Sequence, residues 1–396
     1  MLNFNNTELA FRNKSNYRLK EAYQLFKVLN NKGMVKLGEQ IVNIAFAVKF
    51  PINGILRQTI YKHFVGGRSI NDCSRTIKAL SARNVYSILD YAKEGEESEE
   101  AFNNALKEII KTIEFAQNNK NVPFSAFKIT GIGRFKLLEK ASSGGQLTDE
   151  EIEEYNILEK RVDAVFKRGY ELNIPVLIDA EQTWIQPIID KIVLNMMSKY
   201  NQEKAIVQNT YQLYRHDGLD LLKKHHQISL EKGFKFGLKI VRGAYMEVER
   251  ERAIETGYPT PIHADKMATD HDFNAAIHYL ISNHETIDFM VSTHNEDSSL
   301  LLASLIDENN LPRNLKGVCF SQLYGMSDHI TFNLAVEGYN VAKYIPYGEV
   351  KTMMPYLFRR AKENSSMKGQ TSRELNLIQA EIKRRKNQRR NKIVSD

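Results

Sequence analysis

The chain has 396 residues, of which 42% are hydrophobic and 26% are charged. This composition is typical of a globular protein and excludes a disordered or fibrous one. The length would suit two or three ordinary domains, although an α/β barrel of about 250 residues or more folds as a single unit. The two cysteines, Cys73 and Cys319, cannot build a disulfide framework, which favours a reducing compartment.

The net charge of +7 is concentrated at the C-terminal end, because residues 381–396 contain seven basic and two acidic residues. Such a tail is either a solvated helix end or a segment attracted to an anionic membrane. The longest apolar run, within residues 41–48, is far shorter than the roughly 20 residues that cross a bilayer. No secretory signal is visible. We therefore expect a cytoplasmic protein, peripheral at the inner face of the membrane.

Residues 1–80 lack strand alternation and carry apolar residues at helical spacing, which predicts an N-terminal helical arm or support. From about residue 85, short β-rich apolar runs alternate with long amphipathic stretches. The eight runs are 85–91, 124–130, 174–181, 204–212, 235–245, 288–294, 317–325 and 341–348. Helices are expected over 98–118, 150–172, 186–200, 218–232 and 298–308.

Strands that alternate with helices predict right-handed crossovers and a parallel sheet. Eight such units suit an α/β fold of the closed (βα)8 barrel type over residues 81–370, with an open doubly wound sheet as the alternative. A last helix with an arginine pair ends the barrel, and a basic tail occupies residues 371–396. The sequence Gly131-Ile132-Gly133 lacks the third glycine of a dinucleotide-binding loop.

In a barrel of this kind, catalytic groups lie at the C-terminal ends of the strands. The polar residues within or closing the apolar runs are Lys128, Asp179, Glu181, Gln208, Lys239, Arg242, Thr293, His294, Gln322 and Tyr344. Each could instead have a structural turn role. Lys128 resists that explanation, because it is flanked by Phe127 and Ile129 and a buried ammonium needs an anionic partner or ligand.

The segment 356–364 places Arg359 next to Arg360 in a predicted helix. Their side chains point about 100° apart, so the two guanidinium groups can grip one carboxylate from two sides. Alternatively, they form ordinary helical ion pairs with Glu363. No metal site or serine hydrolase is expected, because H-E-x-x-H spacing, paired cysteines and G-x-S-x-G are all missing from the sequence.

Seven short blocks together resemble the proline dehydrogenase family, in order along about residues 85–370. The blocks are IDAE (178–181), VQNTYQ (207–212), IVRGAY (240–245), STHN (292–295), YGM (324–326), YIPYG (344–348) and RRAKENSS (359–366). The resemblance is to the monofunctional branch that includes the mitochondrial enzymes. It implies a (βα)8 barrel that binds FAD non-covalently.

The resemblance also implies the oxidation of L-proline to Δ1-pyrroline-5-carboxylate, the first step of proline catabolism to glutamate. Hydride would pass from C5 of proline to N5 of the flavin, and the electrons to a membrane quinone. A separate pyrroline-5-carboxylate dehydrogenase would consume the product. No specific nucleic acid is expected as a partner.

The same resemblance assigns roles to the matching positions. Catalytic roles fall on Asp179, Lys239 and Arg242. Substrate binding falls on Lys128, Tyr245, Leu323, Tyr344, Tyr356, Arg359 and Arg360. FAD contacts fall on Ala180, Gln208, Lys239, Val241, Arg242, Gly243, Ala244, Thr293, His294 and Glu363. Glu94 would pair with Arg359 as a gate over bound substrate. Lys239 departs from relatives that have arginine there, and lysine keeps the charge without the bidentate geometry.

Three alternatives remain open at this stage. The substrate could be 4-hydroxyproline, although a phenol at Tyr344 near C4 should exclude the extra hydroxyl. A Schiff-base aldolase barrel using Lys128 would hold no flavin. Nucleic-acid or membrane binding through the basic tail would leave the polar groups at the strand ends unexplained.

Overall fold

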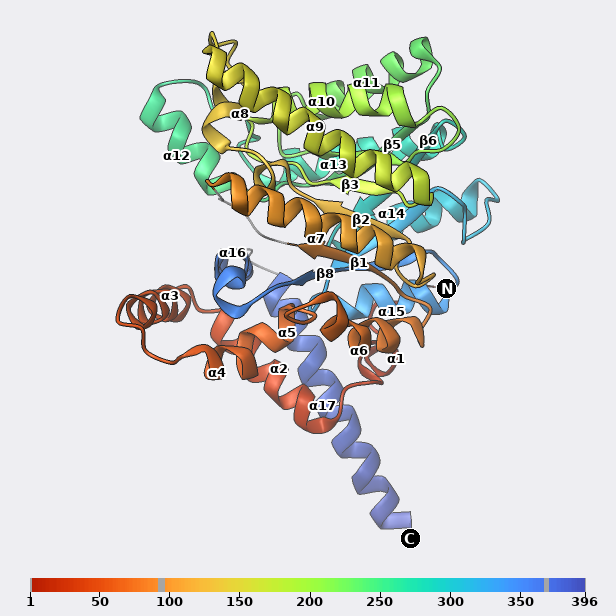
Figure 1. Ribbon diagram of the computed structural model, residues 1–396. Coiled ribbons are helices and arrows are strands. Elements are labelled where there is room, and N and C mark those ends of the chain that lie inside the picture. Colours follow the sequence, from red (N-terminus) through yellow and green to blue (C-terminus); the bar gives the residue numbers. More distant parts are fainter. Residues whose placement is uncertain (1, 92–96, 367–369, 396) are drawn as a thin grey trace.

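The centre of the molecule is a closed barrel of eight parallel strands, in which each strand pairs with its neighbours in sequence and β8 closes on β1 (Figure 1). The computed structural model describes residues 2–91, 97–366 and 370–395. The strands are β1 (Tyr86–Tyr91), β2 (Phe124–Phe127), β3 (Val176–Ile178), β4 (Val207–Gln212), β5 (Phe236–Val241), β6 (Ile287–Ser292), β7 (Val318–Leu323) and β8 (Val341–Tyr347). The predicted (βα)8 barrel is confirmed, and the open sheet is wrong.

Helices surround the barrel and form a layer below it (Figure 1). Before β1 come α1 (Thr7–Phe11), α2 (Asn16–Leu29), α3 (Lys32–Ala47), α4 (Asn53–Leu56), a π-turn (Arg57–Tyr61), α5 (Lys62–Phe64) and α6 (Ile70–Ser81). Between the strands come α7 (Glu99–Gln117), a 3-10 turn (Ile129–Gly131), α8 (Phe135–Ser142), α9 (Asp149–Leu172), α10 (Gln186–Tyr200), α11 (Gly218–Lys232), α12 (Met246–Thr256), α13 (Lys266–Ser282), α14 (Glu296–Glu308) and α15 (Asp328–Val336). After β8 come α16 (Val350–Ser366) and α17 (Gln370–Ser395).

Local sequence explains where these helices begin and end. Thr148 and Glu151 form a reciprocal capping box at the start of α9, with bonds of 3.2 and 2.9 Å between side chains and backbone amides. The helix ends at Asn173, which adopts the left-handed conformation that stops a helix. Such signals set the bounds of the amphipathic segments, and α10 and α11 begin and end at the predicted residues.

The barrel interior is a packed core rather than a channel. Large and small side chains from different strands fill it, as in barrels of this size. They are Ile88, Ala126, Leu177, Met290, Cys319, Ala342 and Tyr344. Tyr344 belongs to this cluster and bonds to Asp179, which follows the carboxyl end of β3, so polar side chains close the packed interior at the carboxyl-end mouth. Helices that follow strands, including α8, α12 and α16, gather at that end, on the left in Figure 1.

The N-terminal helices form a second layer with a hydrophobic core of its own, shared with α16 and α17. Phe26 and Leu29 of α2 belong to this cluster together with Leu357 of α16 and Ile378 of α17. The layer is fastened to the barrel near the ends of β7 and β8, where the amide of Gly66 donates to the Pro346 carbonyl at 2.9 Å. The first 80 residues therefore support the carboxyl-end side of the barrel.

The basic tail belongs to α17, which packs against α1 and α2. Glu381 is fully buried and accepts hydrogen bonds from Thr7 Oγ1 at 2.9 Å, Arg384 Nε at 2.7 Å and Arg385 Nε at 2.6 Å. Arg385 also donates to the carbonyl oxygen of Phe11 at 2.8 Å. The interpretation of this segment as a simple solvated end is thus wrong at least as far as Arg385. Within the described residues, no helix could cross a membrane.

Candidate active site

Three polar side chains from three strands meet at the carboxyl-end mouth of the barrel. Asp179 follows β3, Lys239 lies in β5 and Tyr344 in β8. Lys239 Nζ forms an ion pair with Asp179 Oδ1 and donates to the Tyr344 hydroxyl at 3.2 Å. The Tyr344 hydroxyl donates to the same Asp179 oxygen at 2.7 Å. The side chains of Asp179 and Lys239 are only 15% and 6% exposed, so the cluster is largely removed from bulk water.

The electrostatics of this cluster fix the protonation of its tyrosine. Burial raises the pKa of Tyr344 well above its ordinary value, and the Asp179 carboxylate raises it further. The phenol therefore stays protonated and acts as a hydrogen-bond donor. The Lys239 ammonium also lies 4.5 Å from the centre of the Tyr344 ring, which adds a cation–π contact.

A group of cations predicted to bind a carboxylate lies beside this cluster. Arg360 is buried and donates to Glu363 at 2.5 Å. Burial raises the pKa of Glu363, and the charges of Arg360, Arg359 and Lys128 oppose that rise. Lys128 Nζ lies 3.5 Å from the Tyr245 hydroxyl. The structure thus brings the three predicted cations within electrostatic reach of one carboxylate.

Two further predicted substrate residues border the cations. Tyr356 is buried below the guanidinium of Arg360, whose central carbon lies 5.4 Å from the ring centre. Its hydroxyl has no hydrogen-bond partner among the described residues, and a buried group of that kind is often completed by a ligand or water. Leu323, at the end of β7, packs against the interior cluster of the barrel.

The predicted cofactor residues Arg242, Thr293 and His294 lie at the ends of β5 and β6. Arg242 donates to Asp270 at 2.8 Å, to Thr293 Oγ1 at 2.6 Å and to Ser298 Oγ at 2.9 Å. These bonds occupy three of its five N–H groups and fix the Thr293 hydroxyl. His294 is hydrogen-bonded to Ser327 at 2.9 Å, and burial lowers its pKa well below the usual value, so its imidazole is neutral.

The backbone from Val241 to Ala244 passes closely over an aromatic ring. A Cβ atom on Gly243 would lie 2.5 Å from the ring of Tyr214, and the φ angle of +138° also favours glycine. A larger residue would displace this turn, which carries four of the predicted FAD contacts. Across the mouth, Ala180 lies between Asp179 and Glu181, and the Glu181 carboxylate accepts from the Thr130 amide at 3.0 Å.

The assignment of Gln208 to the cofactor site is wrong in position. Gln208 is the second residue of β4 and donates to the Ala205 carbonyl at 3.2 Å, so it lies at the amino end of the barrel. The last residue of β4 is Gln212, which is buried and donates to the Glu181 carbonyl at 2.7 Å. The sequence analysis missed Gln212, although it closes the VQNTYQ block and satisfies the strand-end rule better than Gln208 does.

Asp90 is a second residue that the sequence analysis missed. It lies near the carboxyl end of β1, is buried, and its charge raises the pKa values of both Tyr344 and Tyr356. The predicted gate residue Glu94 lies outside the described residues, so its pairing with Arg359 stays a prediction.

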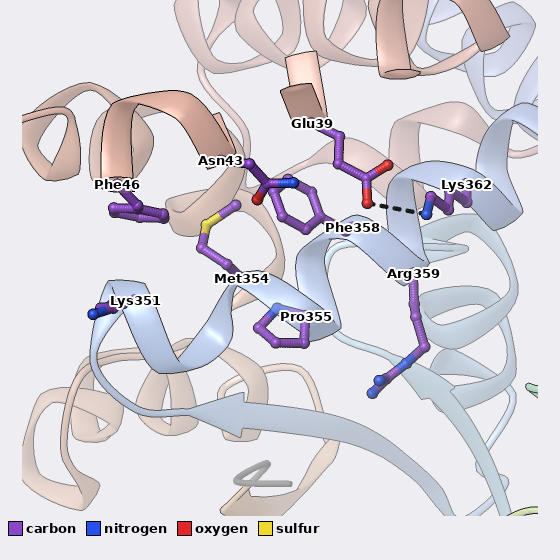
Figure 2. Close-up of a pocket in the computed structure, with 9 residues that line it drawn as sticks. All are labelled: Glu39, Asn43, Phe46, Lys351, Met354, Pro355, Phe358, Arg359 and Lys362. Atoms are coloured by element: carbon purple, nitrogen blue, oxygen red, sulfur yellow. Dashed lines mark ion pairs between the residues drawn. The ribbon is translucent and has the colours of Figure 1, made fainter. Parts of the chain in front are cut away.

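A separate pocket of about 460 Å³ lies between α3 and α16 (Figure 2). Phe46, Met354, Pro355 and Phe358 supply apolar side chains to it, and Glu39 of α3 pairs with Lys362 of α16 at 3.0 Å. Arg359 is the only predicted site residue among those that line it, and in Figure 2 its side chain points away from Glu39 and Lys362. The two adjacent arginines therefore serve different surroundings, as their helical spacing predicts.

Comparisons with known proteins identify the family of this chain. The sequence model of the family described as proline dehydrogenase matches residues 73–373. Proline dehydrogenase 1, mitochondrial, of Dictyostelium discoideum is 30% identical over 96% of this chain and 74% of its own length. Hydroxyproline dehydrogenase of Xenopus laevis is 27% identical over 95% of this chain and 89% of its own length.

The fold is shared with a solved structure of proline utilization A from Bdellovibrio bacteriovorus inactivated by N-propargylglycine. The TM-score is 0.70 and the sequence identity 21%, over 91% of this chain and 38% of that longer one. The chain belongs to the proline dehydrogenase family. Membership supports an oxidoreductase that acts on proline.

Proposed function

We propose that the chain is an FAD-dependent dehydrogenase that oxidises L-proline to Δ1-pyrroline-5-carboxylate, the first step of proline catabolism. The observation that carries the proposal is the Asp179–Lys239–Tyr344 cluster at the barrel mouth, next to the cations Lys128 and Arg360. Proline is a small zwitterion, so its carboxylate offers the best handle for recognition. The cations grip that carboxylate while Tyr344, Tyr356 and Leu323 border the ring.

The residues present fit a flavin. Polar groups face the mouth from consecutive strands: the buried Gln212, Lys239 and Thr293 and the half-buried His294, together with the backbone of 242–244. Glu363 braces Arg360 at the substrate end. When bound, FAD supplies the hydride acceptor for C5 of proline and passes the electrons to a membrane quinone. The protein supplies alignment and charge, which are the usual contributions of a flavoenzyme scaffold.

The amine of proline loses its proton before or during the reaction. Tyr344 does not take that proton, because its pKa is raised well above the usual value and it already donates to Asp179. Oδ1 of Asp179 already forms the ion pair with Lys239 and accepts the hydrogen bond from Tyr344. We therefore assign the proton to solvent rather than to a side chain. A separate dehydrogenase consumes the product.

An absorbance spectrum of the purified protein tests this function. We expect flavin maxima, bleaching by L-proline without oxygen, and formation of a product trapped by o-aminobenzaldehyde. The aldolase alternative would instead be supported by two results together. The purified protein would hold no flavin, and borohydride would attach an added carbonyl compound covalently to Lys128. Flavin that proline fails to bleach would contradict the proposed substrate.

The relative named hydroxyproline dehydrogenase makes 4-hydroxyproline the second candidate substrate. The occupied hydroxyl of Tyr344 argues against it, because both neighbours of that group, Asp179 and Lys239, already bond to it. A substrate hydroxyl would compete with these bonds. We expect a higher kcat/KM for proline than for 4-hydroxyproline, and the reverse order would favour the second candidate.

A further inference from the structure

Helix α3 has two apolar faces, and only one of them is covered. Val35 and Val42 are buried in the core of the helical layer. Met34, Leu37, Ile41, Ile44 and Val48 recur at spacings of three and four residues on the other side, and all are exposed. Ile44 is 64% exposed and Val48 is 68% exposed. A helix with this pattern has a stripe of large hydrophobic side chains facing outward.

Two more exposed apolar side chains follow the stripe along the chain. Phe50 and Ile55 follow it in the turn and in α4, and both are exposed. Seven of the eighteen exposed large hydrophobic side chains among the described residues lie within residues 34–55. We call these seven the α3–α4 surface. Scattered apolar residues need no explanation, but a group concentrated in one short segment of the chain marks an interaction site.

The charge around the α3–α4 surface identifies what covers it. Between residues 22 and 71 the sequence contains seven basic residues and a single acidic one, Glu39. That glutamate is already paired with Lys362. Lys32, Lys36, Lys49 and Arg57 are exposed around the surface. A second copy of this chain would bring the same positive charge to the interface, whereas an anionic lipid surface would neutralise it.

The position of the α3–α4 surface links it to the candidate active site. Helix α3 packs against α16, the helix that carries Arg359 and Arg360. It projects at the edge of the molecule on the side of the barrel mouth (Figure 1). Other residues of α3, namely Glu39, Asn43 and Phe46, line the pocket that it shares with α16 (Figure 2). The basic end of α17 is a weaker candidate, because Arg384 and Arg385 are engaged with Glu381.

We infer that the α3–α4 surface lies in the interface of an anionic lipid bilayer, with its apolar side chains among the acyl chains and its lysines at the headgroups. The helix would lie flat, as amphipathic interfacial helices do, and would not cross the bilayer. This inference rests on the proposed function in one respect. If the electron acceptor is a lipid-soluble quinone, a membrane-bound α3–α4 surface would bring it close to α16.

Sedimentation with lipid vesicles tests the inference. The probe is a vesicle of phosphatidylcholine mixed with phosphatidylglycerol, compared with phosphatidylcholine alone. The variant Leu37→Gln/Ile41→Gln/Ile44→Gln removes the centre of the stripe from positions that are already exposed, so the fold should persist. We expect its binding to anionic vesicles to fall about 100-fold, since half-burial of each of the three aliphatic side chains contributes roughly fivefold.

The matched control carries Ile152→Gln/Ile254→Gln/Met267→Gln, which removes three exposed apolar side chains from α9, α12 and α13. It should bind vesicles like the wild type. The variant Lys32→Gln/Lys36→Gln/Lys49→Gln should lose the preference for anionic lipid, by about fivefold per charge. Flavin content, thermal melting and proline oxidation with a soluble dye as acceptor should be unchanged in all of these variants.

Wild-type protein that stays in the supernatant with anionic vesicles would overturn the inference. So would equal binding by the stripe variant and the wild type. A wild-type dimer in analytical ultracentrifugation that becomes a monomer in the stripe variant, without vesicle binding, would assign the surface to a second copy. These readings do not depend on catalysis, so a flavin that proline fails to bleach would overturn the proposed function and leave the membrane test intact.

Discussion

The hydroxyl of Tyr344 donates to Oδ1 of Asp179 at 2.7 Å, and Lys239 is paired with that same oxygen. One carboxylate oxygen therefore compensates a buried ammonium and orients a phenol. Because the Lys239 side chain is only 6% exposed, the ion pair with Asp179 offsets part of the cost of burying its ammonium group. The cluster links β3, β5 and β8 across the mouth, so its effects reach both stability and catalysis.

Asp179→Asn should lower the free energy of unfolding by about 3–5 kcal/mol, because it leaves the Lys239 ammonium buried without its counter-ion. The double variant Asp179→Asn/Lys239→Met should recover much of that loss, since it removes both charges. Urea denaturation of the flavin-free protein measures both values. Equal stability of Asp179→Asn and the wild type would mean that water, and not the carboxylate, compensates the lysine.

The two glutamines of β4 should differ in their effect on the flavin. Gln212→Ala should weaken FAD retention by about tenfold, since one hydrogen bond contributes roughly 0.5–1.5 kcal/mol. Gln208→Ala, at the opposite end of the strand, should retain normal flavin and serves as the matched control. Flavin content after dialysis, with the absorbance ratio as the readout, separates them. Loss of flavin from Gln208→Ala alone would restore the first assignment.

Arg360→Met should raise the proline KM by about 10- to 150-fold while the protein retains flavin, because a charge-assisted bond contributes roughly 1.5–3 kcal/mol. Arg359→Met should have a smaller effect on KM, since Arg359 also lines the pocket between α3 and α16. Steady-state kinetics beside a thermal melt checks both variants. If Arg360→Met melts earlier but keeps its KM, the arginine only braces α16 through Glu363.

Stability should fall on the acid side of neutrality because buried histidines are neutral in the folded protein. Burial lowers the pKa of His225 from 6.5 to about 4, and its Nδ1 is hydrogen-bonded to the Tyr211 hydroxyl at 2.7 Å. The unfolded chain binds a proton below pH 6.5 that the folded chain does not. The unfolding free energy should therefore fall as pH drops from 6.5 to about 4, by about 1.4 kcal/mol per pH unit for this group.

Urea denaturation at several pH values measures that slope. In the His225→Gln variant, the unfolding free energy should fall less steeply with decreasing pH, by the contribution of one proton. His271→Gln, at a side chain that is 81% exposed, is the matched control and should follow the wild type. An unchanged slope in His225→Gln would contradict the neutral assignment.

Arg385→Ala should lower the melting temperature, because Arg385 bonds the buried Glu381 and the Phe11 carbonyl. Leaving part of that carboxylate unsatisfied costs about 1–3 kcal/mol. Arg389→Ala removes the same charge from an exposed position four residues later, so its melting temperature should match that of the wild type. Equal melting temperatures of the two variants would mean that the tail is a solvated end throughout and that Arg385 does not stabilise the fold.

The strands and helices of the barrel were predictable because burial and periodicity are properties of neighbouring residues. The position of a side chain along its strand was harder to predict. The apolar run 204–212 begins before β4 does, and this shift hid the difference between Gln208 and Gln212. Lys128, Asp179, Lys239 and Tyr344 were found because charged or polar groups inside apolar strands demand a partner.

Contacts between distant segments could not be predicted from the sequence. Arg242 was assigned to FAD, but three of its N–H groups bond residues of α13, β6–α14 and α14, up to 56 positions away. Glu381 lies in a basic tail, and nothing in the sequence of that tail indicates that Thr7 will donate a hydrogen bond to it. The apolar stripe of α3 was read only as helical spacing, because a sequence does not say which of two apolar faces is covered.

The bond between Thr7 and Glu381 joins residues 374 positions apart, and it closes the core that α1 and α2 begin. During synthesis, these first helices leave the ribosome long before their last partner exists. Their apolar faces therefore stay exposed to solvent while the barrel is synthesised. The helical layer therefore forms only once α17 has been synthesised, and nascent chains that lack α17 are the ones that chaperones should capture.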